Sequence, residues 1–174
     1  LFRRSAPGPT ARGFRYAQTV STAAMAFGHG MQDAAKTAGV VALALVASGH
    51  RAPGDLSIPW WAIASSAVVL SVGTYAGGWR IIRTLGSRII DLTPPQGFAA
   101  EATAATVLYV ATATGAPIST TQAISSAIVG VGATRSAKSV RWGVARSIAI
   151  AWVLTIPGAG LIAAVVYLLI ATFL

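Results

Sequence analysis

Long apolar runs, interrupted by short polar or glycine-rich segments, dominate the hydrophobic pattern of this chain. The runs occupy residues 14–49, 60–78, 97–133 and 141–174. A helix that crosses the hydrocarbon core of a bilayer needs about 20 consecutive, mostly apolar residues. The pattern predicts an all-α integral membrane protein, with residues 1–13 as a basic, flexible lead-in and residues 14–174 as the membrane domain.

The first run carries a polar segment, residues 28–36, near its middle. Each apolar arm beside this segment is shorter than a full membrane crossing requires. Two interpretations are therefore open: a single helix that carries a polar patch, or two half-helices that meet inside the membrane. The closely spaced Gly28 and Gly30 favour the broken helix. Both interpretations place Asp33 and Lys36 inside the membrane.

The run at residues 97–133 is divided by a second polar segment, residues 114–121, which contains Gly115 and Pro117. Its two arms are rich in Ala, Ser and Thr. Irregular backbone at membrane depth is tolerated only where protein or a polar cavity surrounds it. This composition predicts a re-entrant helical hairpin rather than two lipid-facing helices.

The last run, residues 141–174, contains Pro157 near its middle. Two full crossings would need about 40 residues plus a turn, which is more than this run holds. Proline inside a helix removes a backbone hydrogen bond and kinks the helix. We therefore expect one kinked crossing.

Basic residues gather next to the apolar runs. They are Arg3, Arg4, Arg12 and Arg15 before the first run, Arg80, Arg83 and Arg88 after the second, and Arg135, Lys138 and Arg141 before the last. Such clusters are typical of cytoplasmic loops, so we expect the N-terminus inside the cell and the C-terminus outside. Residues 80–96 are both basic and amphipathic, which predicts a helix lying on the cytoplasmic membrane surface.

The composition indicates lipid rather than water as the solvent. Of the 174 residues, 55% are hydrophobic and only 10% are charged, whereas a soluble domain carries about 25% charged residues. The net charge of +9 would suit a nucleic-acid partner, but its position beside the apolar runs argues against one. Because the chain has no cysteine, it has no disulfide framework and no cysteine-based metal site.

The polar segment at residues 28–36 has the chemistry of an anion site. A helix that restarts there offers free backbone N–H groups and a positive dipole end, and Lys36 adds a positive charge. Asp33 can accept a hydrogen bond from a protonated oxyanion or hold a coupling cation. Alternatively, Asp33 and Lys36 only neutralise one another, although charges within a membrane more often mark a functional path. His29 either relays protons or serves in hydrogen-bonded packing.

The second polar segment places three consecutive hydroxyl groups directly after Pro117. They belong to Ser119, Thr120 and Thr121. At the start of a half-helix these hydroxyl groups can donate hydrogen bonds to an oxyanion without adding charge. The alternative interpretation is that they only cap the helix N-terminus. Glu101 is the other acid within an apolar arm, where it either binds a coupling ion or forms a salt bridge with a cytoplasmic arginine.

In this order and spacing, the motifs resemble the PiT family of inorganic phosphate transporters. The family signature runs approximately Gly-Ala-Asn-Asp-Val-Ala-Asn, occurs once in each of two inverted repeats, and is often preceded by His in its second copy, as at His29. The similarity covers nearly all of the chain from Thr19 onward. It continues through residues 89–92, 95–101, 117–121, 130–132, 140–142 and 151–157.

The resemblance implies the C-terminal half of an inverted-repeat secondary transporter, which carries phosphate with a coupling cation across the cytoplasmic membrane in several passes. The candidate substrate-binding residues are Gly30, Gln32, Asp33, Lys36, Ser119, Thr120 and Thr121. The candidates for the coupling ion are His29, Asp33 and Glu101. No resident metal or cofactor is expected.

Two positions depart from the signature, because Gln32 and Lys36 stand where the family commonly has Asn. Lys at the second position looks like the proton-coupled bacterial branch, which carries phosphate as a metal complex. This favours H⁺ over Na⁺ as the coupling cation. Gln122 also stands where the family frequently has His.

The inverted repeats imply that half of the substrate site is supplied by another segment. Sites in such folds form between two repeats near the membrane midplane, so a second signature is expected upstream of Leu1. The expected partners are inorganic phosphate, the lipid bilayer and the N-terminal half of the same transporter. A homo-oligomer stays open, and the chain alone is not expected to transport.

Two alternatives remain beside phosphate transport. The first is a permease of the same fold for sulfate or another oxyanion, but sulfate is fully deprotonated at pH 7 and cannot donate a hydrogen bond to Asp33. The second is a non-transporting membrane subunit in which Asp33 and Lys36 form a structural pair. An enzyme is not expected, because the sequence places no general base beside Ser119.

Overall fold

The computed structural model describes residues 7–172 of the chain. All regular structure in this part is helical, which confirms the all-α prediction. The elements are α1 (Pro7–Ala47), α2 (Trp60–Arg83), a π-helical turn η1 (Thr84–Arg88), α3 (Pro94–Ala113), α4 (Thr120–Arg135), a 3-10 turn η2 (Ala137–Ser139) and α5 (Trp142–Ala171).

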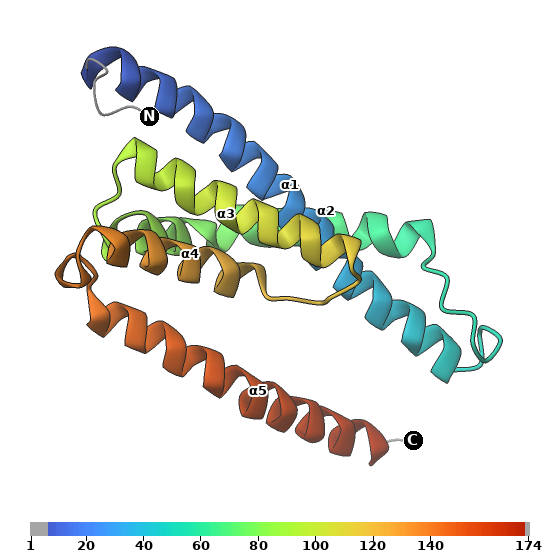
Figure 1. Ribbon diagram of the computed structural model, residues 1–174. Coiled ribbons are helices and arrows are strands. Elements are labelled where there is room, and N and C mark those ends of the chain that lie inside the picture. The colour runs from blue at the N-terminus through green and yellow to red at the C-terminus, as the bar shows by residue number, and fades with distance from the viewer. Residues whose placement is uncertain (1–6, 173–174) are drawn as a thin grey trace.

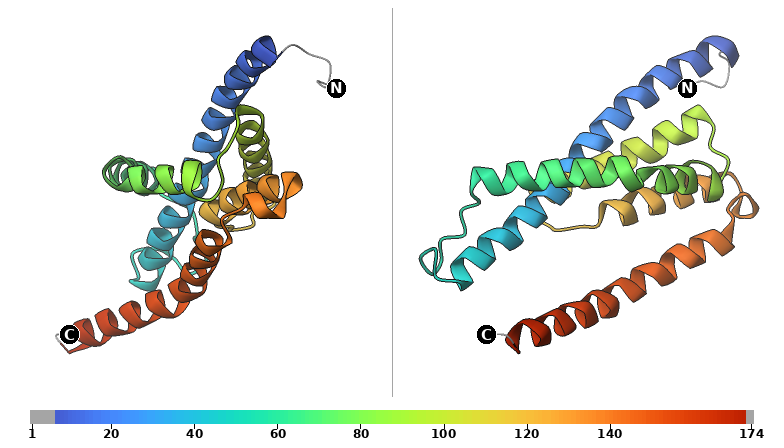
Figure 2. Two further views of the ribbon diagram at one scale, coloured as in Figure 1. Left: turned by 90° about the vertical axis from the view of Figure 1, so that its left-hand side faces the viewer. Right: turned by 180° about the vertical axis from the view of Figure 1, so that it is seen from behind.

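The long helix α1 runs obliquely through the molecule, and the other helices are arranged around it (Figure 1). α3 and α4 form an antiparallel hairpin whose first helix packs along α1, while α2 crosses α1 on another side. The C-terminal part of α5 extends away from the other helices (Figure 2). The tip of the hairpin, residues 114–119, stops short of the loop that joins α1 to α2 (Figures 1 and 2).

α1 is one continuous helix through the polar segment, so the break expected at Gly28 and Gly30 is wrong. Its 41 residues give a length of about 60 Å, which is twice the roughly 30 Å of a bilayer core. The helix can remain intact because its polar side chains find partners on α3 and α4. Gly28 lies inside the helix, buried against Leu108 and Tyr109 of α3, where a Cβ would make an ordinary contact of 3.6 Å with Leu108 Cβ.

α1 also begins earlier than expected. Residues 7–13, which the pattern assigned to a flexible lead-in, form the first turns of this helix. Proline is favourable at such a position because the first helical N–H groups have no intrahelical acceptor. The lead-in prediction is therefore wrong for residues 7–13, and for residues 1–6 it lies outside the described part of the chain.

The segment between α2 and α3 is not the separate surface helix expected at residues 80–96. Its first residues complete α2 and η1, and its apolar residues Ile89 and Ile90 are buried in a cluster with Ala100 and Ile128. They are buried because this segment passes between the hairpin and α5. The Arg141 backbone N–H donates to the Ile89 carbonyl at 2.9 Å.

Two structural features define the hairpin. α3 starts with a capping box formed by Thr93 and Gln96, and the chain leaves its far end through Gly115, whose φ of 68° is favourable only for glycine. Two helices separated by this break confirm the predicted hairpin. Whether its tip lies within the membrane stays a prediction.

Within residues 7–172, two helical segments are long and apolar enough to cross a membrane, Trp60–Arg88 and Trp142–Ala171. In their most apolar windows only 6% and 0% of the residues are buried, whereas the core helix of a soluble protein would be largely covered. α5 continues through Pro157 as a single helix, which confirms one helix rather than two in the last run. Large apolar side chains are exposed over much of the described surface, which is typical of a surface that contacts lipid or another protein segment.

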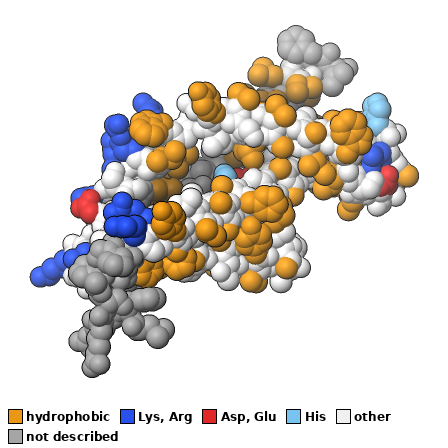
Figure 3. Space-filling model, turned by 90° about the horizontal axis from the view of Figure 1, so that it is seen from above, with side chains coloured by type: hydrophobic (Ala, Val, Ile, Leu, Met, Phe, Trp, Pro, Cys, Tyr) orange, Lys and Arg blue, Asp and Glu red, His pale blue; other side chains and the backbone are white. Residues whose placement is uncertain are grey.

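The basic side chains on the face shown in Figure 3 gather mainly at one end of the molecule. This end holds the C-terminus of α2 with Arg80 and Arg83, and the end of α4 with Arg135. Asp91 and Arg141 also pair at this end at 2.8 Å. The grouping agrees with a cytoplasmic side, and the orientation in the membrane stays a prediction.

Gly132 on α4 provides a test of the packing at this end. A Cβ at Gly132 would lie 2.9 Å from both Ile90 Cδ1 and Val140 Cγ2, whereas a Cβ at Gly130 would meet nothing within 4 Å. Both alanine variants gain the same helix propensity, so a difference between their free energies of unfolding measures the cost of packing the added methyl group. We expect Gly132→Ala to unfold at lower temperature than Gly130→Ala, by a stability difference of about 1–3 kcal/mol. Thermal unfolding in detergent measures this, and equal melting temperatures would contradict the packing described.

Candidate functional site

The polar segment of α1 and the start of α4 come together in space. His29 Nδ1 lies 2.8 Å from Thr120 Oγ1 on α4 and 3.5 Å from a carboxylate oxygen of Asp33. The other carboxylate oxygen of Asp33 lies 3.3 Å from Lys36 Nζ. Lys36 in turn donates a hydrogen bond to the Ile118 carbonyl in the hairpin tip. Two segments about 90 residues apart in sequence therefore form one polar cluster.

This cluster is open on one side. The exposed fractions of the His29, Asp33 and Lys36 side chains are 36%, 27% and 36%. A hollow in the middle of the face shown in Figure 3 exposes a histidine and an acidic side chain between apolar ones. The carboxylate and ammonium charges balance, so a protonated His29 would leave the cluster positive.

Gln32 points toward α3. Its Nε2 donates to Thr112 Oγ1 at 3.1 Å and to the Leu108 carbonyl at 3.5 Å, and the side chain is 6% exposed. Both amide hydrogens are therefore used within the protein, which makes Gln32 a residue that joins α1 to α3. A direct contact of Gln32 with substrate stays a prediction. Gly30 is half-buried, and a Cβ there would meet nothing within 4 Å.

The three hydroxyls at the start of α4 have different surroundings. Ser119 caps the helix, because its Oγ accepts a hydrogen bond from the Gln122 backbone N–H at 3.3 Å. Thr120 is buried against His29. Thr121 is exposed. The capping interpretation thus holds for Ser119, while the N-terminus of α4 brings its positive dipole end to the cluster.

Glu101 lies apart from this cluster, toward the start of α3. Its Oε2 accepts hydrogen bonds from Ser21 Oγ at 2.7 Å and Thr22 Oγ1 at 2.9 Å. It forms no salt bridge with a described arginine, so the cytoplasmic pairing considered above is not found. Its role toward a coupling ion stays a prediction. Among the residues that the structure describes, no three His, Cys, Asp or Glu side chains lie together in a group that could hold a metal ion.

The sequence did not indicate four contacts that complete the arrangement. Thr112 and the Leu108 carbonyl receive Gln32, and the Ile118 carbonyl receives Lys36. Tyr109 Oη also donates to the Ala24 carbonyl on α1 at 3.1 Å. Thr112, a polar residue in an apolar arm, could have been recognised from the sequence as a hydrogen-bond partner. Backbone carbonyl acceptors cannot be predicted in this way, because every residue has one.

Lys36 provides a test of the tie between α1 and the hairpin tip. Lys36→Met keeps the length of the side chain but removes the hydrogen bond to Ile118. A hydrogen bond to a charged group contributes about 1.5–3 kcal/mol, so we expect amide exchange at the tip to accelerate at least about tenfold. The Ala116 amide, which donates to the Ala111 carbonyl, is the reporter in hydrogen-exchange mass spectrometry.

The matched control is Thr37→Val. The Thr37 hydroxyl bonds only to the Asp33 carbonyl of its own helix, so exchange at the tip should not change. Unchanged exchange in Lys36→Met would show that Lys36 does not hold the tip.

Comparison with known proteins places this arrangement in a family. Residues 3–163 match the model of the phosphate transporter family. A probable low-affinity inorganic phosphate transporter of Rhizobium meliloti (strain 1021) is 44% identical over 167 residues, which cover 96% of this chain and 50% of that protein. A protein of the same description from Bacillus subtilis (strain 168) is 37% identical, over 98% of this chain and 51% of its own.

A solved structure is similar as well. It is described as the sodium-dependent phosphate transporter and matches with a TM-score of 0.76 and 32% sequence identity, over 90% of this chain and 40% of that one. The chain spans about half the length of these curated relatives. The relatives are transporters, not enzymes, and the match over residues 3–163 shows that the chain belongs to the phosphate transporter family.

Proposed function

We propose that this chain is the C-terminal half of an ion-coupled symporter of inorganic phosphate in the cytoplasmic membrane. The observation that carries the proposal is the meeting of Asp33 and Lys36 on α1 with Thr120 at the start of α4. One face then holds an ammonium group, a helix N-terminus and hydroxyl groups, which are donors suited to an oxyanion. The names of the relatives supply the identity of the oxyanion.

Asp33 favours phosphate over sulfate at this face. Near neutral pH phosphate carries at least one proton, so it can donate a hydrogen bond to the carboxylate. The exposed Thr121 and the backbone N–H groups of the first turn of α4 donate to its other oxygens, and Lys36 balances charge. Ser119 shapes the helix start and adds its hydroxyl.

We favour a proton as the coupling cation, with sodium as the alternative. Lys36 already places a positive charge against Asp33, where a bound sodium ion would meet repulsion. The solved relative described as sodium-dependent supports the alternative. The coupling cation would act at Asp33, His29 or Glu101. We expect phosphate to be carried as a metal complex.

The position of the candidate site within the helices suggests the architecture of the whole transporter. The polar cluster occupies residues 29–36, just past the middle of α1. The hairpin tip stops short of the end of that helix (Figures 1 and 2). This position supports a re-entrant hairpin that ends at the membrane midplane, where an inverted repeat would supply the other half of the site. The open side of the cluster is the place for that half.

The central test measures labelled-phosphate uptake in cells without their own phosphate carriers. They express this chain with the N-terminal half of a family member. We expect Asp33→Asn to reduce uptake at least about tenfold, because one lost hydrogen bond to a charged group accounts for that much. Equal membrane expression is required for the comparison.

Asp55→Asn is the matched control for the loss of a carboxylate. Asp55 lies in the loop between α1 and α2, far from the cluster. Hydrogen bonds from the Ser57 side chain and backbone hold the pKa of Asp55 below its ordinary value, so its carboxyl group is ionised. Uptake should be unchanged in this variant. Equal uptake by wild type and Asp33→Asn would remove Asp33 from the site, and no uptake by any well-expressed pair would contradict the proposed transport.

Sulfate competition separates the two oxyanions. Sulfate at the same concentration as phosphate should leave labelled-phosphate uptake nearly unchanged at pH 7. Sulfate carries no proton for Asp33, and the loss of one hydrogen bond to a charged group weakens its binding at least about tenfold. Strong inhibition by sulfate would favour the permease alternative.

A further inference from the structure

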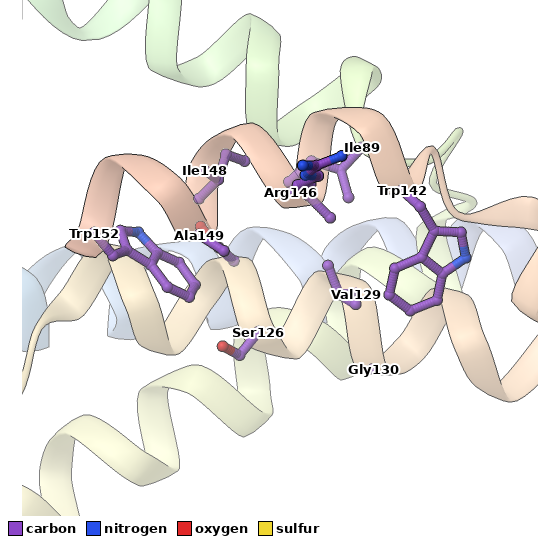
Figure 4. Close-up of a pocket in the computed structure, with 11 residues that line it drawn as sticks. Ile89, Ser126, Val129, Gly130, Trp142, Arg146, Ile148, Ala149 and Trp152 are labelled. Carbon is purple, nitrogen blue, oxygen red and sulfur yellow. The ribbon is translucent and has the colours of Figure 1, made fainter. Parts of the chain in front are cut away.

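A groove between α4 and α5 lies outside the candidate phosphate site. It has a volume of about 570 Å³ and is lined mainly by apolar side chains of these two helices. Figure 4 shows Trp152 and Trp142 toward its two ends, with Ser126, Val129 and Gly130 along the α4 side. An elongated, apolar space between two helices suits a hydrocarbon chain.

Arg146 is the charged residue that lines this groove. It lies about 6 Å along α5 from Trp142, one turn into a helix that is apolar enough to cross the membrane. It forms no ion pair with a described residue, whereas Arg51 and Arg141 pair with Asp55 and Asp91. The Arg146 side chain is exposed, and from one turn inside α5 it can reach the headgroup region of a bilayer while its stem lies along the apolar wall.

A second, independent observation is the hydroxyl of Ser125. This side chain lines the same groove and is 2% exposed. Its Oγ has no hydrogen-bond partner among the described residues. Leaving a buried hydroxyl unpaired is unfavourable, so the helix packing beside the groove leaves one hydrogen bond unmade.

We propose that this groove binds an anionic phospholipid of the cytoplasmic leaflet. The phosphate pairs with Arg146, whose planar guanidinium can donate two parallel hydrogen bonds to it. An ester oxygen of the glycerol accepts a hydrogen bond from the exposed Ser126, and one acyl chain follows the apolar wall toward Trp152. This site is separate from the proposed phosphate path.

Charge complementarity determines the choice of occupant. The Trp142 end of the groove lies next to the basic connection between α4 and α5, which carries Arg135, Lys138 and Arg141. Basic pockets between membrane helices on the cytoplasmic side attract anionic headgroups. A free phosphate ion would gain the same arginine but would have to be dehydrated against the apolar wall, whereas a lipid fills that wall with its acyl chain.

The test uses the purified chain in nanodiscs with equal amounts of phosphatidylglycerol and phosphatidylcholine that carry identical acyl chains. After mild extraction, native mass spectrometry measures the retained lipid. We expect phosphatidylglycerol to be retained about fivefold over phosphatidylcholine, since one arginine near an anionic surface accounts for about that factor. Arg146→Gln should remove the preference, while Arg83→Gln, at the same end but outside the groove, should keep it.

Each other outcome overturns the proposal in a recognisable way. Equal retention of both lipids, or equal losses in Arg146→Gln and Arg83→Gln, would indicate only a general attraction to the basic end. Displacement by millimolar inorganic phosphate would assign Arg146 to a free anion. Displacement by the N-terminal half of a family member would assign the groove to the contact between halves.

A second measurement uses the wild-type chain, so its result does not depend on whether a variant folds. A phosphatidylglycerol probe with a photoreactive group in its acyl chain should label peptides from α4 and α5 that contain Val129 and Trp152. Labelling of α2 to the same extent would contradict a defined site in the groove.

Discussion

A charged segment in the middle of an apolar helix is stable only where another part of the protein supplies polar partners. In α1 this segment contains His29, Gln32, Asp33 and Lys36, and the hairpin of α3 and α4 supplies the partners. The position of the polar segment therefore sets how far along α1 the hairpin tip reaches. Each half of this arrangement would be costly in lipid without the other.

Close contact between α1 and α3 makes this pairing geometrically feasible. Small residues are buried on both helices, Gly28 and Ala34 on α1 and Ala104 and Ala111 on α3, and Gly28 lies against Leu108 and Tyr109 of α3. Small side chains allow membrane helices to approach closely, and their packing supplies much of the attraction in lipid. The approach brings Gln32 within hydrogen-bonding distance of Thr112. The alanine and glycine content of the chain thus contributes directly to the geometry of the candidate site.

The sequence predicted the helices and the hairpin better than it predicted contacts. Length and hydropathy indicated α2 and α5, and Gly115 with Pro117 marked the turn of the hairpin. The break at Gly28 was wrong because glycine alone cannot distinguish a helix end from a site of close packing. The surface helix at residues 80–96 was wrong because Ile89 and Ile90 have helical spacing but fill a core formed by distant residues. Asp33 and Lys36 were recognisable as charges within an apolar run, whereas the carbonyl partner at Ile118 was not.

The most direct test of the site uses the absence of cysteine in the chain. Thr121→Cys, paired with a cysteine-free N-terminal half from a family member, introduces one thiol at the exposed start of α4. The rate at which a small water-soluble thiol reagent modifies it is measured with and without phosphate, and Thr134→Cys at the basic end of α4 is the control. Phosphate should slow modification of Thr121→Cys several-fold and leave Thr134→Cys unchanged. Equal rates with and without phosphate at Thr121→Cys would contradict a phosphate site between α1 and the start of α4.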